Sequence, residues 1–120
     1  MKKFLIITQQ TDKFTELAKG LSDGKTNDIV WADSVATARP AAFGLVDLII
    51  IDENLDGQSG LIIAKDMIRV NALAHLALVT TLSPEEFHEA SEGLGVLTSL
   101  PPHPGAKDAE RLLNALAALS

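Results

Sequence analysis

The segment from Val46 to Leu61, VDLIIIDENLDGQSGL, decides the fold of this chain. Its first six residues are apolar except for Asp47, and such a run is typical of a central strand in a parallel sheet that is covered on both faces. The run stops at Asp52, and after a loop that extends to Gln58 the side chain of Ser59 can cap a helix. The expected inward face of this helix is Leu61, Ala64, Met67 and Ile68. The segment therefore predicts a strand, a loop and a helix of a layered α/β domain.

The same unit of a short apolar run and an amphipathic stretch repeats along the chain. The runs that predict strands are 4–7, 29–32, 46–51, 76–79 and 96–100. The stretches that predict helices cover 14–21, begin at Ser34, Ser59 and Ser83, and cover 109–116. Pro40 is expected to kink or end the second helix, and Gly93 to end the fourth. Five alternating strands and helices predict a parallel sheet with helices on both faces, in which Trp31 would be a core residue of the second strand.

Composition limits the classes of function. A length of 120 residues with 47% apolar and 22% charged residues predicts one globular domain over residues 1–120. The chain has no cysteine, which excludes disulfides and thiolate metal sites. Its net charge is −6 and its ten basic residues are scattered, which argues against nucleic-acid binding. Because no apolar stretch approaches the roughly 20 residues of a membrane span and the N-terminal apolar run is too short for a signal peptide, we expect a cytoplasmic protein without membrane contact.

A functional site is expected at one edge of the predicted sheet. In open α/β sheets, ligands bind beyond the carboxyl ends of the strands, near the switch in strand order. In this chain that rule selects four loops: 8–12, 52–57, 80–83 and 99–105. The three histidines do not share one of these loops or a metal-ligand spacing, so surface positions are expected for His75, His88 and His103.

The segment 47–61 resembles the central signature of response-regulator receiver domains. An aspartate ends the third strand there, and a glycine eight residues later opens the third helix, as Asp52 and Gly60 do here. The resemblance covers essentially the whole chain, since Thr80, Gly93-Leu94 and the proline of Leu100-Pro101 also fall at family positions. It implies a doubly wound, flavodoxin-like fold with strand order 2-1-3-4-5. It also implies that Asp52 is the phosphoacceptor position and that Thr80 is the phosphate-contact position.

The chain departs from the receiver pattern at five positions. Receivers carry an acidic pair just after the first strand, where this chain has Thr8 and Gln9. Leu100 takes the place of the family's lysine, Leu97 that of the switch aromatic of the fifth strand, and Asp56 that of the loop proline. In the family, Mg²⁺ held by the acidic pair, together with the lysine, neutralises the charge of the incoming phosphoryl group.

The loss of those groups predicts weak or absent phosphorylation of Asp52. Two unit charges 4 Å apart repel by about 4 kcal/mol at an effective dielectric constant of 20, and phosphoryl transfer depends on neutralising such charge. The sequence keeps only two possible ligands of the family's magnesium site, the carboxylate of Asp52 and the backbone carbonyl of Asn54. Glu53 and Asp12 are candidates to replace the missing acidic pair. Strand alternation, however, predicts that the side chain of Glu53 points away from Asp52. We therefore expect no bound cofactor, a doubtful magnesium site and no catalytic residue.

The resemblance implies a signalling protein without enzymatic activity that a histidine kinase or a downstream protein contacts. We expect the partner to bind a surface that combines the helix after Ser83, the strand 96–100 and the last helix. The same surface could instead form a homodimer. The acidic residues of that helix suit either a solvated face or a docking face. They are Glu85, Glu86, Glu89 and Glu92.

Two alternatives stay open. The chain is a competent phosphoacceptor that uses substitute metal ligands, or it is a small flavodoxin-like ligand-binding domain. The second alternative lacks support in the sequence, because the chain has no tyrosine and no GxGxxG or Walker motif.

Overall fold

Five parallel strands form the central sheet of the computed structural model, which describes residues 2–22 and 27–119. The strands are β1 (Lys3–Ile7), β2 (Asp28–Ala32), β3 (Leu48–Ile51), β6 (His75–Val79) and β7 (Val96–Leu100). Their order in the sheet is β2-β1-β3-β6-β7. Counted along the chain, this is the order 2-1-3-4-5, so the predicted fold class and strand order are confirmed.

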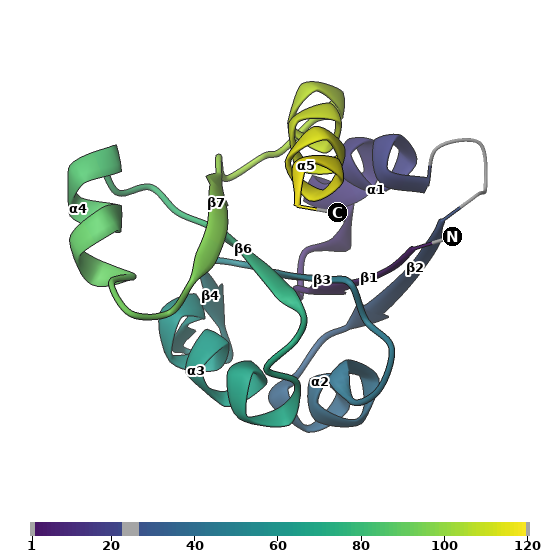
Figure 1. The fold of residues 1–120 in the computed structure, drawn as a ribbon. Helices are drawn as coiled ribbons and strands as arrows, with labels where there is room; N and C mark the ends of the chain where they lie inside the picture. The colour runs from purple at the N-terminus through teal and green to yellow at the C-terminus, as the bar shows by residue number, and fades with distance from the viewer. Residues whose placement is uncertain (1, 23–26, 120) are drawn as a thin grey trace.

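Helices cover both faces of this sheet (Figure 1). One face carries η1 (Thr11–Phe14), α1 (Thr15–Ser22) and α5 (Ala106–Ala118), which pack above the sheet in the figure. The other face carries α2 (Val35–Ala42) and α3 (Gly60–Val70), and α4 (Pro84–Ala90) lies beyond β7 at the side of the molecule. No helix within residues 2–22 and 27–119 combines the length and the apolar character needed to cross a membrane.

The two helical layers create two apolar clusters, one on each face of the sheet. Side chains of β3 alternate between them: Leu48 and Ile50 join the cluster under α1 and α5, while Ile49 and Ile51 join the cluster under α2 and α3. All four side chains are fully buried. This two-sided burial is the reason that the strand reads as a continuous apolar run, because neither face of the strand meets water.

The predicted starts of three helices are confirmed. The side chain of Ser34 accepts a hydrogen bond from the backbone N–H of Thr37, Ser59 accepts one from Leu61, and Ser83 accepts one from Glu86. Each bond satisfies an N–H group that the first turn of a helix leaves without a partner.

Two predicted helix ends were wrong. α2 continues two residues past Pro40 to Ala42, because in so short a helix the proline removes only one backbone hydrogen bond. α4 ends at Ala90, before Gly93, and the hydroxyl of Ser91 donates a hydrogen bond of 2.7 Å to the carbonyl of Phe87 in the last turn.

Two predictions about burial also need correction. Trp31 is 40% exposed and is not a core residue, because β2 is an edge strand of the sheet. On α3, Ala64 and Met67 are buried as predicted, but Ile63 is buried with them, whereas Leu61 and Ile68 are only partly covered.

Candidate functional site

Three polar residues follow directly on three adjacent strands at the carboxyl edge of the sheet. Thr8 follows β1, Asp52 follows β3 and Thr80 follows β6. β1 and β3 pair in register, with Ile7 opposite Ile51, so the next residues of the two chains are also neighbours. The loops that the sequence selected for a site therefore meet at this edge, as the doubly wound topology requires.

Both carboxylate oxygens of Asp52 accept hydrogen bonds from the chain itself. The hydroxyl of Thr8 donates to Oδ2 at 2.6 Å, and the backbone N–H of Glu53 donates to Oδ1 at 2.7 Å. Thr8 is 1% exposed, and its hydroxyl oxygen accepts a further hydrogen bond of 2.9 Å from the N–H of Gln10. Hydrogen bonds to a carboxylate are short and strong, so these two donors fix the orientation of the Asp52 side chain.

The backbone at the start of α3 lies close to the backbone at the end of β3, next to Asp52. The N–H of Gly60 donates to the carbonyl of Glu53 at 2.8 Å. A Cβ atom on Gly60 would lie 2.4 Å from the carbonyl oxygen of Asp52, closer than atoms of these types can approach. Glycine is therefore needed at position 60, because any side chain there would prevent the start of α3 from packing against the end of β3.

The loop after Asp52 forms a small hairpin that sequence reasoning missed. β4 (Asn54–Leu55) pairs antiparallel with β5 (Gln58–Ser59). Asp56 and Gly57 connect them with φ angles of 52° and 77°, the positive pair that a type I′ turn requires. The signal was present, because an Asp-Gly dipeptide is among the strongest sequence markers of a two-residue hairpin.

A second side-chain bond joins the loop after β1 to this hairpin. The amide nitrogen Nε2 of Gln9 donates to Oδ1 of Asp56 at 2.6 Å. Together with the bond from Thr8 to Asp52, it links the two loops at two points. Thr8 and Gln9 therefore act as neutral donors toward two carboxylates.

The carboxylate of Glu53 is hydrogen-bonded to another loop, and Asp12 is exposed. The carboxylate of Glu53 accepts hydrogen bonds from the N–H and the hydroxyl of Thr81, at 2.6 and 2.9 Å, so its side chain turns toward the loop after β6. Asp12 is exposed in η1, and Asn54 is exposed in β4. Across residues 2–22 and 27–119, no three His, Asp or Glu side chains are grouped so that they could hold a metal ion.

Comparison with known proteins gives matches at the level of structure. No protein-family model matches the sequence, and no curated protein sequence matches it. Among solved structures, a CheY-like receiver domain from Methanospirillum hungatei JF-1 has a TM-score of 0.80 at 15% identity, with 98% of this chain and 95% of that chain covered. A two-component response regulator from Clostridium difficile has a TM-score of 0.80 at 20% identity, with coverage of 98% and 97%. The chain has the receiver-domain fold.

A third structure with this fold bears on the site. A response regulator from Burkholderia pseudomallei, solved with a phosphorylated aspartic acid, a calcium ion and citrate, has a TM-score of 0.76 at 21% identity. The match covers 97% of this chain and 66% of that chain. At these identities, the similarity establishes the receiver fold and leaves the chemistry to the residues present.

The residues at the carboxyl edge do not fit a magnesium ion. Magnesium in proteins binds through one or two carboxylates and keeps several waters in a near-octahedral shell. Here the side chains of Thr8 and Gln9 both donate hydrogen bonds toward carboxylates. A donor group directed at Asp52 competes with a cation for the same oxygen.

Leu100, at the end of β7, is part of the core. Leu100 is 2% exposed and joins the apolar cluster under α1 and α5, which Leu97 also contacts. Its carbonyl accepts a hydrogen bond of 3.0 Å from the N–H of Thr80, which holds the end of β6 against β7. No cation therefore reaches Asp52 from this strand.

Thr80 lies at the rim of a hollow beside Asp52. Its hydroxyl oxygen accepts a hydrogen bond of 3.0 Å from the N–H of Leu82. The hollow has a volume of about 320 Å³ and lies between the start of α3 and α4, with Glu53, Thr80 and Phe87 in its lining. Asp52 is not among the residues that line this hollow, although its neighbour Glu53 is.

Proposed function

We propose that this chain is a receiver-like signalling protein of two-component systems that acts through protein contacts, with weak or absent phosphorylation of Asp52. The observation that carries the proposal is the pair of hydrogen bonds that occupies both oxygens of Asp52. The proposal assigns no catalytic residue and no resident cofactor to the chain.

The hydrogen bond from Thr8 opposes phosphoryl transfer directly. Attack on a phosphoryl group through Oδ2 of Asp52 would weaken the hydrogen bond that the hydroxyl of Thr8 donates to this oxygen at 2.6 Å. Hydrogen bonds to charged groups contribute about 1.5–3 kcal/mol each. Thr8 is 1% exposed, so its hydroxyl would then need another acceptor within the protein.

Charge opposes the same step. The attacking carboxylate and the phosphoryl group are both negative, and their repulsion at about 4 Å is about 4 kcal/mol at an effective dielectric constant of 20. Neutralisation of this charge is the main contribution of a protein to phosphoryl transfer. With Thr8, Gln9 and Leu100 at the relevant positions, the chain supplies no such neutralisation.

The surface proposed for the partner lies over α4, β7 and α5. In α4, Glu85, Glu86 and Glu89 are exposed. Among the residues of this helix, only Phe87 is buried. This acidic surface suits a basic patch on a kinase or on a downstream protein.

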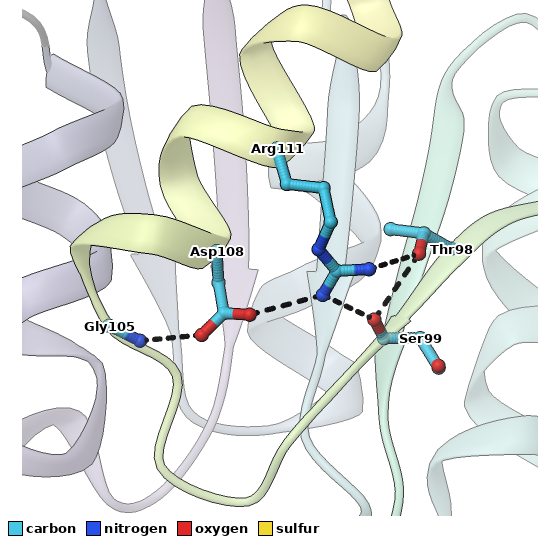
Figure 2. A network of polar contacts seen from close by, with 5 residues as sticks. All are labelled: Thr98, Ser99, Gly105, Asp108 and Arg111. Carbon is cyan, nitrogen blue, oxygen red and sulfur yellow. Dashed lines mark hydrogen bonds and ion pairs between the residues drawn. The ribbon is translucent and has the colours of Figure 1, made fainter.

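A polar network fixes α5 to the edge strand β7 (Figure 2). The guanidinium of Arg111 donates to the hydroxyl of Thr98 at 2.9 Å and to the carbonyl of Ser99 at 3.1 Å. It also contacts Asp108 at 3.1 Å, and Asp108 accepts a hydrogen bond of 2.9 Å from the N–H of Gly105. The contacts of Arg111 hold α5 against β7, and Leu97 takes the place of the switch aromatic. Both features favour recognition of this surface by a partner in a way that does not depend on phosphorylation.

Incubation with acetyl phosphate and Mg²⁺, followed by intact-mass analysis, tests the proposal. We expect little or no phosphoryl adduct on the unaltered chain. The double variant Thr8→Asp/Gln9→Asp restores an acidic pair and should gain Mg²⁺ binding and a detectable adduct, and Asp52→Asn in that background should abolish the adduct. The matched control Thr8→Asn/Gln9→Asn has similar shape without charge and should gain neither.

A near-stoichiometric adduct on the unaltered chain that disappears in Asp52→Asn would contradict the proposal. It would instead support a competent phosphoacceptor with substitute ligands. If neither the chain nor its acidic variant accepts a phosphoryl group, the proposal of weak or absent phosphorylation stands, and the loss of the acidic pair is not its only cause.

A further inference from the structure

Three large apolar side chains project into solvent at the end of the sheet opposite to Asp52. Phe43 and Leu45 lie between α2 and β3 and are 76% and 94% exposed, and Leu73 lies between α3 and β6 and is 92% exposed. Leu45 and Leu73 line one hollow of about 230 Å³. We call these three side chains the apolar ridge. Single exposed apolar residues are common on protein surfaces, but a group on neighbouring loops marks a contact site.

The side chain of Asn71 holds both loops of the ridge in place. Its Nδ2 donates to the carbonyl of Ala42 at 3.0 Å and to that of Gly44 at 2.9 Å, on either side of Phe43. Its Oδ1 accepts from the N–H groups of Leu73 and Ala74 at 3.1 and 3.2 Å. All the donors and acceptors of this amide are directed at the loops, so the ridge is ordered before any partner arrives. A preorganised surface loses little conformational entropy on binding.

The charges beside the ridge are balanced. A second hollow, of about 340 Å³, contains Leu45 in its lining together with two lysines and two aspartates, Lys2, Lys3, Asp28 and Asp47. The chain as a whole carries a net charge of −6, so two copies repel each other over most of their surface. The four charges in the lining of this hollow sum to zero, so like charges oppose the approach of a second copy less here than the net charge of the chain would suggest.

The acidic surface of α4 is a poorer place for two copies to meet. Contact there would bring Glu85, Glu86 and Glu89 of one copy toward the same residues of the other, since a two-fold interface pairs a surface with itself. The pairing of like charges would disfavour the homodimer that the sequence suggested for the surface of α4, β7 and α5.

We propose that a second copy of this chain docks on the apolar ridge and forms a two-fold symmetric dimer. In such a dimer the ridge of one copy packs on the ridge of the other, and the lysines of each copy meet the aspartates of its partner. Because the patch is small, the dimer is weak and depends on concentration. The inference does not rest on the proposed function, since the ridge shares no residue with the edge that carries Asp52.

Sedimentation velocity over a range of chain concentrations tests this dimer. The double variant Leu45→Asp/Leu73→Asp should raise the dimer dissociation constant about tenfold or more, because two anchor residues at the centre of the interface become charged. Both positions are more than nine-tenths exposed, so thermal unfolding of the variant should match that of the unaltered chain. The control Ile62→Asp changes an apolar residue on α3 that is 57% exposed and should leave the dissociation constant unchanged.

A charge-swap experiment separates a second copy from other occupants. Lys3→Glu makes the hollow beside Leu45 acidic, and Asp28→Lys makes it basic. Each variant alone should dimerise less than the unaltered chain, because like charges then meet across the two-fold interface. An equimolar mixture of the two should regain association, because unlike surfaces then meet in a heterodimer.

Three outcomes would overturn the inference. They are a monomer at millimolar chain concentration, a dimer that survives Leu45→Asp/Leu73→Asp, and a mixture of the charge variants that associates no better than either alone. Binding of the monomer to vesicles that contain phosphatidylserine, lost in the double variant, would assign the ridge to a lipid surface instead.

Discussion

The two ends of the sheet use polar side chains in opposite ways. At the carboxyl end, Thr8 and Gln9 donate to the carboxylates of Asp52 and Asp56, so the groups that would bind an ion are already paired within the chain. At the amino end, Asn71 pairs only with backbone groups and leaves the apolar side chains around it exposed. This difference is the basis of both proposals: a carboxyl end whose carboxylates are paired within the chain, and an amino end whose apolar side chains are exposed.

Removal of Asn71 should disturb the amino end most strongly. We expect Asn71→Ala to lower the free energy of unfolding by about 2–4 kcal/mol, because four hydrogen bonds contribute about 0.5–1.5 kcal/mol each and part of them lies at the surface. Urea denaturation measures the loss. Asn71→Asp keeps the acceptor but places a carboxylate oxygen beside the carbonyl oxygens of Ala42 and Gly44, so its loss should be at least as large. A clearly smaller loss in Asn71→Asp than in Asn71→Ala would contradict the role given to the amide donors.

A methyl group on Gly60 should disturb the carboxyl end. Gly60→Ala places a Cβ atom 2.4 Å from the carbonyl oxygen of Asp52, and we expect a loss of about 1–3 kcal/mol in the free energy of unfolding as the backbone moves. Gly105→Ala is a comparison variant, since its Cβ would meet no atom within 4 Å. If Gly60→Ala proved no more destabilising than Gly105→Ala, the claim that the backbone at position 60 lies too close to the carbonyl of Asp52 for a side chain would be wrong.

The hydroxyl of Thr8 can be removed with little change in shape. Thr8→Val should lower the free energy of unfolding by about 1–2 kcal/mol, because Oδ2 of Asp52 and the N–H of Gln10 each lose a partly buried hydrogen bond. Thr8→Ser retains the hydroxyl and should lose less. Thermal melts at neutral pH distinguish the variants, and a fully stable Thr8→Val would show that the hydroxyl contributes nothing to the site.

The bond between Gln9 and Asp56 should have the smallest effect. Both residues are exposed, so water replaces the lost partner in Gln9→Ala, and we expect a change of less than about 0.5 kcal/mol in the free energy of unfolding. The variant should show instead in amide hydrogen exchange, with faster exchange in the hairpin of β4 and β5. Unchanged exchange at Leu55 would mean that Gln9 does not hold the hairpin.

The sequence predicted the positions of the strands and helices better than the burial of individual side chains. The strand over 46–51 was evident because burial on both faces produces an unbroken apolar run, and the caps Ser34, Ser59 and Ser83 were evident because capping is local. Trp31 was misplaced because its burial was inferred from the apolar run alone, although the strand order 2-1-3-4-5 that the resemblance implies already puts this strand at the sheet edge.

The site was predicted by position, but its contacts were not. The sequence identified Thr8 and Gln9 as lost ligands, yet it did not reveal that they donate to Asp52 and Asp56, which lie 44 and 47 residues away. Asn71 was missed for the same reason, because its partners on the other loop lie 27 and 29 residues away and nothing in the local pattern marks them. The Asp56-Gly57 hairpin is different, since its local signal was present.

Amide NMR in the presence of beryllofluoride and Mg²⁺ tests the central claim most directly. Beryllofluoride is a phosphoryl mimic that can bind an acceptor carboxylate only if the carboxylate is free and its charge is neutralised. We predict that the amide signals of Asp52, Glu53 and Thr80, and those of Thr98 and Ser99 on β7, do not shift. Saturable shifts at Asp52 and Thr80 in the unaltered chain would contradict the account.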